Sequence, residues 1–277
     1  MISYTIFGHM ALSELQRIIT EQKKIRSIYL KRDVTVDFYI PSNTEPAELS
    51  LLLINDGQDL KKMQFSLLLG QLLQSAQITP LLCIGIHAGE RLSEFGTAHI
   101  VDYKNRGEKA FAYQQFLIEE LLPLVHTVCG IESFKTKAVA GFSLGGLTAF
   151  DTLWNFPDLF SIAGVFSGSL WWRTKGLKEG YNEETDRIIH QKIKKATYRP
   201  GLRFYFTTGS LDEIADRNNN GIIDSIDDTL ALIEELKNLG YNTGYDIKYI
   251  NYEEGKHDVV TWGKAMPQFL LWGWGRK

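Results

Sequence analysis

The sequence has few cysteines, no long apolar run and no excess of basic residues. Cys83 and Cys129 are the two cysteines among 277 residues, and both lie in apolar segments. We therefore expect buried free thiols, not a disulfide framework. No stretch of eighteen apolar residues is present, so no membrane-spanning helix is expected. The formal net charge of −3 lacks the basic surplus that nucleic acids or anionic membranes require of a partner.

The first residues lack the features of a secretory signal. There is no basic start, no continuous apolar run and no cleavage site of small residues. We therefore expect a cytoplasmic protein. The length suits one large domain with a substantial core. We assign residues 1–33 to an N-terminal extension and residues 34–277 to a single domain.

Short apolar runs alternate with longer helical patterns along the chain, which predicts an α/β fold. Its central sheet would be mostly parallel, with helices on both faces. The predicted strands are Val34–Ile40, Ser50–Asn55, Leu81–His87, Lys137–Phe142, Ser161–Ser167, Arg203–Gly209 and Asp246–Tyr252. The predicted helices are Lys61–Ser75, Ala110–Val128, Leu144–Trp154, Glu183–Ala196, Ile226–Leu239 and Val260–Leu271.

Two further segments have weaker patterns. Near the N-terminus, Leu12–Lys24 resembles a helix and Ile28–Leu30 a short opening strand. The polar segment 171–201 separates two predicted strands. We interpret this segment as a helical excursion that acts as a cap over a cleft.

The sharpest motif is Gly141-Phe142-Ser143-Leu144-Gly145-Gly146, between a predicted strand and a predicted helix. Glycines two residues before and after a serine allow strand and helix to pack closely, so the serine lies on a tight, strained turn. The backbone N–H of Leu144 would then point toward a developing oxyanion. The alternatives are a turn without chemistry or a phosphate-binding loop, but no Lys-Ser/Thr pair ends this loop. Ser143 is therefore the predicted nucleophile.

A serine nucleophile needs a base, and the base needs an acid to orient it. Where the serine lies on such a turn, the acid and then the histidine follow it along the chain. Of the two histidines after Ser143, His190 lies in a polar helical segment and is predicted to be a surface residue. His257 follows a late strand and is the predicted base. Asp212 is the predicted acid, with Glu213 as the alternative.

The loop after an early strand supplies the second oxyanion donor in this arrangement. Asn55-Asp56-Gly57-Gln58-Asp59 follows the strand Ser50–Asn55. We assign the donor to the backbone N–H of Gln58, with Gly57 as the near alternative. A plain β-turn is the interpretation without function.

A second motif runs from Asp216 to Asp227 and matches a calcium-binding loop. Oxygen-bearing side chains fall at its first, third and fifth positions and a glycine at its sixth. A polar Asn/Gly turn before a capped helix is the alternative. The motif predicts structural calcium beside the acid loop, with no cofactor for catalysis. The predicted metal ligands are Asp216, Asn218, Asn220, Ile222, Asp224 and Asp227.

Several segments together resemble the esterase family of the α/β-hydrolase superfamily that includes enterochelin esterases, feruloyl esterases and esterase D. These segments include Asp56-Gly57-Gln58, 91–95, 116–125, GFSLGG at 141–146, SGSLWW at 167–172 and Gly255–Asp258, with Trp262 downstream. The resemblance implies the α/β-hydrolase fold and ester hydrolysis through an acyl-enzyme. Cytosolic enterochelin esterases carry a further N-terminal domain, whereas residues 1–33 are the expected N-terminal extension here.

Three residues are candidates for substrate contact. Trp171 and Trp172 follow a predicted strand and either line the acyl or aryl pocket or pack in the core. Arg91 either meets an acidic substrate or forms an ion pair with Glu94 that holds a loop.

The predicted function is that of a serine carboxylic ester hydrolase acting on a small-molecule ester. Siderophore esters, acylated sugars and short-chain esters are the candidate substrates. The first alternative is an acyltransferase that uses a sugar or lipid alcohol as acceptor. The second is a calcium-binding module for a carbohydrate or a protein partner, with a vestigial triad.

Overall fold

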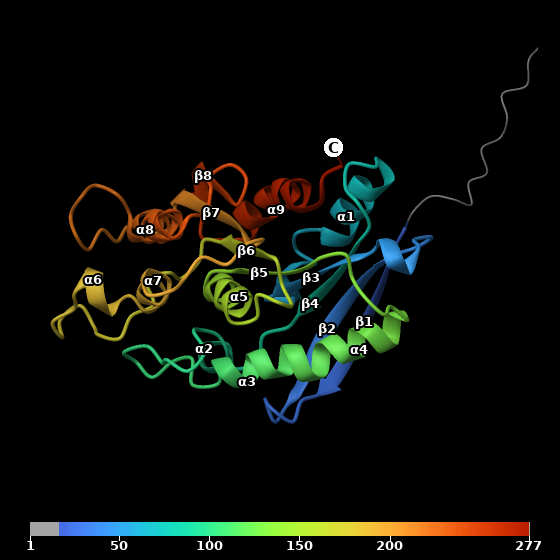
Figure 1. Ribbon diagram of the computed structural model, residues 1–277, viewed down its shortest axis with the longest axis horizontal. Coiled ribbons are helices and arrows are strands. Elements are labelled where there is room, and N and C mark those ends of the chain that lie inside the picture. The colour runs from blue at the N-terminus through green and yellow to red at the C-terminus, as the bar shows by residue number, and fades with distance from the viewer. Residues whose placement is uncertain (1–16, 277) are drawn as a thin grey trace, which may run out of the picture.

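A computed structural model describes residues 17–276 of the chain. Its centre is one eight-stranded sheet with the order β1-β2-β4-β3-β5-β6-β7-β8 (Figure 1). The pairs from β4 to β8 are parallel, whereas β1 and β2 are antiparallel at one edge. The strands are β1 (Ile18–Arg26), β2 (Asp33–Pro41), β3 (Ser50–Asn55), β4 (Leu81–Ile86), β5 (Lys137–Phe142), β6 (Ile162–Phe166), β7 (Arg203–Leu211) and β8 (Ile247–Lys256).

Helices cover both faces of the sheet (Figure 1). Because successive side chains of a strand face opposite sides, Leu51 and Leu53 of β3 enter one core, and Leu52 and Ile54 enter the other. α1 and α9 enclose the second core, and α3, α4, α5, α7 and α8 enclose the first. The helices are α1 (Phe65–Gln74), α2 (Arg91–Glu94), α3 (Ala110–Gln115), α4 (Leu122–Cys129), α5 (Leu144–Asn155), α6 (Glu183–Asp186), α7 (Ile188–Lys194), α8 (Asp224–Leu239) and α9 (Val259–Trp274), with short turns η2 (Pro46–Glu48), η3 (Gly57–Asp59) and the π-helical η4 (Phe116–Leu121).

The predicted α/β fold, with a mostly parallel sheet and helices on both faces, is confirmed. The N-terminal elements were predicted wrongly. Residues 18–24 form strand β1 instead of a helix, because this polar stretch pairs with β2 over nine residues. Residues 12–16 of the predicted helix lie outside the described residues. Ile28–Leu30 is a turn between β1 and β2, not a strand.

Residues 18–26 were assigned to an N-terminal extension, but as strand β1 they belong to the main sheet. The predicted helix Glu183–Ala196 is broken, because Arg187 has extended backbone angles between α6 and α7. Helix α7 packs beside α8, and a covering role for residues 171–201 stays a prediction.

Within residues 17–276, no helix combines the length and apolar character that crossing a membrane requires. Cys83 is buried, Cys129 is half-buried, and both are free thiols. The prediction of buried thiols therefore fits Cys83 better than Cys129.

Candidate active site

Ser143 lies on the tight turn between β5 and α5. Its backbone has φ 54° and ψ −120°, a region that non-glycine residues rarely adopt without support. A Cβ atom at Gly141 would lie 2.3 Å from the carbonyl oxygen of Gly145, so the turn can close only with glycine there. The Asn55 side chain donates to that same carbonyl at 2.8 Å and accepts from the Tyr113 hydroxyl at 2.7 Å. Hydrogen bonds from β3 and α3 thus stabilise the strained turn.

The Ser143 side chain is half-buried, and its hydroxyl lies 3.3 Å from the hydroxyl of Ser169. The Ser143 N–H donates to the carbonyl of Phe166 at the end of β6. Leu144 is the first residue of α5, so its N–H is at the positive end of the helix dipole. The sequence did not single out Ser169, and no spacing signal points to it.

The loop after β3 approaches the sheet closely. Asp56 has φ 59°, and a Cβ atom at Gly57 would lie 2.3 Å from the Gly85 carbonyl carbon, so only glycine fits. The Gln58 side chain donates to Asp56 at 3.2 Å and accepts from the Ala88 N–H at 3.1 Å. These contacts fix the loop, and the oxyanion role of the Gln58 N–H stays a prediction.

Arg91 holds the same loop from its other side. Its guanidinium donates to both carboxylate oxygens of Asp56, at 2.8 and 3.0 Å, and to the carbonyl of Phe142 at 3.1 Å. The predicted pairing of Arg91 with Glu94 is wrong. The buried Glu94 accepts instead from Arg32 at 2.5 and 2.6 Å, because Arg32 reaches it from the turn between β1 and β2.

Asp212 follows β7, and His257 follows β8. The Asp212 side chain is fully buried and accepts from the Gly209 N–H at 2.9 Å. Its other oxygen has no hydrogen-bond partner and lies 3.9 Å from Nδ1 of His257, within ion-pair distance but longer than a hydrogen bond. The alternative acid, Glu213, is placed beside the backbone of Ser225 at the start of α8. The geometry therefore favours Asp212 over Glu213.

Burial governs the charge of both groups. It raises the pKa of Asp212 and lowers the pKa of His257, because each loses solvation of its charged form. The carboxylate of Asp212 opposes the fall in the pKa of His257, and the cation of Arg91 adds to it. At neutral pH these influences favour a neutral imidazole, which can accept a proton.

Trp262 of α9 connects the two halves of this region. Its ring stacks on Phe142, with centroids 5.2 Å apart, and meets the ring of His257 edge-on, also at 5.2 Å. Its indole N–H donates to the hydroxyl of Ser167 at 3.1 Å. Phe142, which precedes Ser143, and His257, the predicted base, therefore both contact Trp262. The sequence indicated Trp262 only through the family resemblance.

The two tryptophans after β6 differ in exposure. Trp171 is half-buried, so it can still line a substrate site. Trp172 is fully buried and lies against Gly96 and Gly107, so it offers no surface to a substrate in this structure. Core packing is the reading that fits Trp172.

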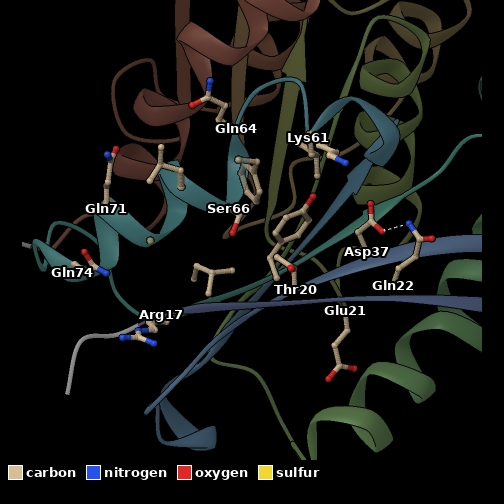
Figure 2. A pocket seen from close by; sticks show the side chains of 16 residues that line it. Arg17, Thr20, Glu21, Gln22, Asp37, Lys61, Gln64, Ser66, Gln71 and Gln74 are labelled. Carbon is tan, nitrogen blue, oxygen red and sulfur yellow. Dashed lines mark hydrogen bonds between the residues drawn. The ribbon is translucent and has the colours of Figure 1, made fainter. Parts of the chain in front are cut away.

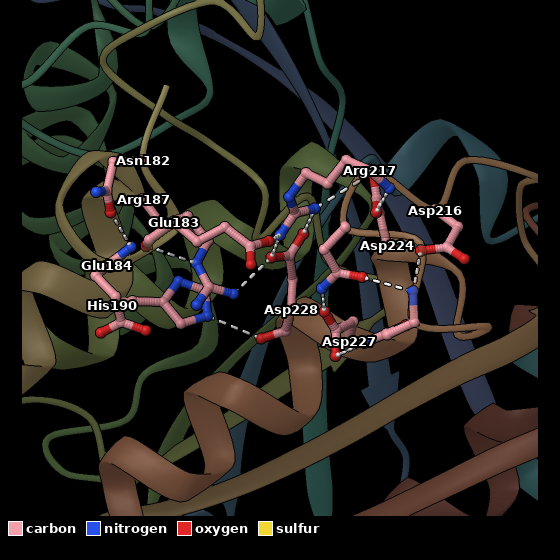
Figure 3. Close-up of polar contacts among 12 residues, drawn as sticks. Asn182, Glu183, Glu184, Arg187, His190, Asp216, Arg217, Asp224, Asp227 and Asp228 are labelled. Carbon is pink, nitrogen blue, oxygen red and sulfur yellow. Dashed lines mark hydrogen bonds and ion pairs between the residues drawn. The ribbon is translucent and has the colours of Figure 1, made fainter. Parts of the chain in front are cut away.

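His190 is buried, contrary to the prediction that it lies on the surface. Its Nε2 lies 2.8 Å from the carbonyl oxygen of Asp228 on α8 (Figure 3). The Asp228 carboxylate also accepts from Arg187 at 2.8 Å and from Arg217 at 2.9 Å. The helical segment faces α8, which its polar residues did not reveal, since they form a buried network there.

In the predicted calcium loop, the Asp216 carboxylate accepts from the backbone of Asn220 and Gly221 (Figure 3). The amide groups of Asn218 and Asn220 face Asp227, and Asp224 pairs with Arg217 at 3.3 Å. Among the described residues, no group of three or more His, Cys, Asp and Glu side chains is arranged to hold a metal ion. Calcium binding, including the role of the Ile222 carbonyl, stays a prediction.

A cavity of about 770 Å³ lies between α1 and the hairpin of β1 and β2 (Figure 2). Lys61, Gln64 and Asp37 are among the side chains around it. None of the predicted site residues lines this cavity. Cavity size alone would therefore not have located Ser143.

The mostly parallel sheet, its two helical layers and a serine on the strand-to-helix turn after β5 define the α/β-hydrolase fold. The family model described as "Putative esterase" matches residues 27–272. The chain therefore belongs to this esterase family.

Two curated relatives are each 25% identical to the chain. One is the uncharacterized protein YbbA of Bacillus subtilis, aligned over 58% of this chain and 63% of its own length. The other is the iron(III) enterobactin esterase of Escherichia coli, aligned over 56% of this chain and 34% of its own. The chain thus spans less than two thirds of the length of either relative.

A similar solved structure is the enterobactin esterase FES of Shigella flexneri in the presence of 2,3-di-hydroxy-N-benzoyl-serine. Its TM-score is 0.68 at 22% identity, over 92% of this chain and 58% of that one. At this identity, the likeness supports the fold alone.

Proposed function

We propose that the protein hydrolyses small-molecule carboxylic esters through an acyl-enzyme on Ser143. The observation that carries the proposal is the contact of Asp212 with His257, two strands away from the strained turn of Ser143. β5, β6, β7 and β8 are adjacent parallel strands, so the residues that follow them lie together at the carboxyl ends of the strands. Membership of the esterase family supports the same reaction class.

In the first half of the reaction, the Ser143 hydroxyl attacks the ester carbonyl carbon while His257 takes its proton. The N–H groups of Leu144 and Gln58 stabilise the oxyanion that forms. Asp212 orients the imidazole and stabilises its positive charge. Collapse of the tetrahedral intermediate expels the alcohol, which receives the proton from His257, and leaves the acyl group on Ser143.

In the second half, His257 takes a proton from water as the water attacks the acyl-enzyme. The second tetrahedral intermediate releases the carboxylic acid, and the proton returns to the oxygen of Ser143. The chain's own groups perform every proton transfer, so the proposed route uses no cofactor.

The substrate classes under this proposal are siderophore esters, acylated sugars and short-chain esters. One relative is an iron(III) enterobactin esterase, which supports including siderophore esters. Purified protein assayed with one ester of each class would rank them by kcat/KM. The class with the highest value identifies the chemistry to which the site is matched.

The substitution Ser143→Ala tests the mechanism. We expect kcat for 4-nitrophenyl acetate to fall by at least about a thousandfold, because the acyl-enzyme cannot form. Labelling by a fluorophosphonate should disappear as well. The matched control is Ser66→Ala, since Ser66 lines the separate cavity beside α1. Hydrolysis or labelling retained at the wild-type level in Ser143→Ala, with an intact fold by circular dichroism, would reject the proposal.

A further inference from the structure

An arginine surrounded by aromatic rings follows β6. The guanidinium of Arg173 lies 4.8 Å from the ring centroid of Tyr103 and 5.5 Å from those of Trp171 and Tyr181. The four side chains are half-buried, so the cluster reaches the surface. Rings on several sides restrict the guanidinium to a narrow range of orientations.

Arg173 has no acidic partner among the described residues, since no carboxylate lies within 4.0 Å of it. Its Nε is buried and has no hydrogen-bond partner. The neighbouring Arg106 stacks on the same Trp171 ring at 5.2 Å, but its charge is satisfied by Asp102. The hydroxyl of Tyr181, whose ring also faces Arg173, is likewise buried without a partner.

Buried donors without acceptors are costly, and each therefore calls for an explanation. One of them is Nε of the unpaired cation itself, and the other is the hydroxyl of Tyr181, whose ring lies 5.5 Å from the guanidinium. A bound group with acceptor oxygens and a negative charge would satisfy this environment. A planar carboxylate matches the fork of a guanidinium better than other common anions of its size.

The cluster is close to the proposed nucleophile. Ser169, whose hydroxyl lies 3.3 Å from that of Ser143, precedes Arg173 by four residues. Four residues span at most about 14 Å. The actual span is shorter, because the chain turns where the Trp172 N–H donates to the Ser169 carbonyl at 3.3 Å. One ester molecule of moderate size can therefore reach both Ser143 and Arg173.

We infer that Arg173 binds a carboxylate carried by the ester substrate, at a distance from the bond that is cleaved. The inference rests on the proposed esterase function and adds a substrate class to it, namely acidic esters. The surrounding rings fix the orientation of the guanidinium. No carboxylate of the described residues pairs with it, so none competes with the substrate for it. Arg173 is in this role a specificity residue and takes no part in the chemical steps.

Matched ester pairs provide the test. One series is the 4-nitrophenyl monoesters of dicarboxylic acids with four to ten carbons, and the other is the neutral 4-nitrophenyl esters of the same chain lengths. In acetylated 4-hydroxycinnamic acid the carboxylate lies on the alcohol part of the acetyl ester. Its methyl ester is the neutral compound for comparison. We expect wild-type kcat/KM to favour the acidic member of at least one pair. The chain length with the largest preference would report the reach to Arg173.

The variant Arg173→Gln should lower that preference by about tenfold, since a hydrogen-bonded charge is lost. Its kcat/KM for neutral esters should stay near the wild-type value. The control is Arg203→Gln, because Arg203 also stacks on an aromatic ring, that of Trp272, at 4.1 Å. Arg203 is the first residue of β7 and so lies at the amino ends of the parallel strands, away from Ser143. The control should keep the wild-type preference.

No preference for acidic esters in the wild type would overturn the inference, as would a preference that survives in Arg173→Gln. Failure of the esterase proposal looks different, since neutral esters would then also go unhydrolysed. The preference should also weaken as salt rises from 0.05 to 0.5 M in the assay, because a half-exposed charge pair is screened.

Discussion

A histidine base works only in its neutral form, so the acid limb of the pH profile reports its pKa. Burial lowers the pKa of His257 below its ordinary value of about 6.5. We therefore expect kcat/KM for a neutral ester to rise with pH, with the midpoint of the rise below the ordinary value for histidine. Stopped assays between pH 4.5 and 8 would measure this profile. A midpoint above 7 would contradict the expected environment of His257.

The role of Asp212 can be tested through the same pKa. Its carboxylate raises the pKa of His257, so Asp212→Asn should shift the imidazole titration to lower pH. Nuclear magnetic resonance of the His257 ring would follow this shift without depending on the reduced activity. Glu213→Gln is the matched control, since Glu213 lies beside the start of α8. An equal shift in both variants would argue against a specific contact of Asp212.

Single residues show where sequence reasoning was sufficient. The tight turn at Ser143 could be predicted because glycines at fixed offsets are a local requirement of that turn. Trp262 and Ser169 could not be ranked, because they approach Ser143 or His257 only through the pairing of distant strands. The partner of Arg91 was predicted wrongly for the same reason. Glu94 is nearby in sequence, whereas Asp56 comes from the loop after β3.

At the scale of elements, buried parallel strands were predicted well because their apolar runs are continuous. The edge strand β1 was missed, since its exposed polar residues lack that signal. Its hydrogen bonds come from β2, which supplies a structure that local propensity did not favour. The break at Arg187 was also invisible, because the extended backbone there pairs with Arg173, which is distant in the sequence.

The loop between β7 and α8 carries the calcium prediction. If residues 216–227 bind Ca²⁺, chelation by EDTA should lower the melting temperature and kcat together, because the same loop begins four residues after Asp212. Added Ca²⁺ should restore both. Asp216→Ala removes the first ligand, so this variant should no longer respond to EDTA. A wild-type protein whose melting temperature is unchanged by EDTA and by Ca²⁺ would rule out the prediction.

At the scale of the whole molecule, the fold class could be predicted from the alternation of strands and helices. What remained hidden is how the polar excursion of residues 171–201 joins the body of the protein. Beside the apolar side chains that α7 adds to the first core, it does so through a buried network, in which Asp228 accepts hydrogen bonds from both Arg187 and Arg217 (Figure 3). Periodicity describes apolar faces, and it gives no signal for a polar contact of this kind.

This network makes the stability of the whole protein sensitive to acid. His190 is almost fully buried within it, and burial lowers the pKa of His190 to about 3, with the cation of Arg187 adding to the effect. In the unfolded chain the pKa returns to about 6.5. The unfolded state therefore binds more protons between pH 6.5 and 3, and stability falls as the pH drops through that window.

We expect the free energy of unfolding in urea to fall with decreasing pH, with His190 contributing about 1.4 kcal/mol per pH unit below pH 6.5. Between pH 7 and 5 this amounts to about 2 kcal/mol. His190→Gln removes the titrating group, so its loss over the same interval should be smaller than that of the wild type by this amount. His99→Gln is the control, because His99 is exposed, and it should behave as the wild type does. Parallel pH dependence in His190→Gln and the wild type would show that the imidazole of His190 can take up a proton within the fold, which is incompatible with its burial between α7 and α8.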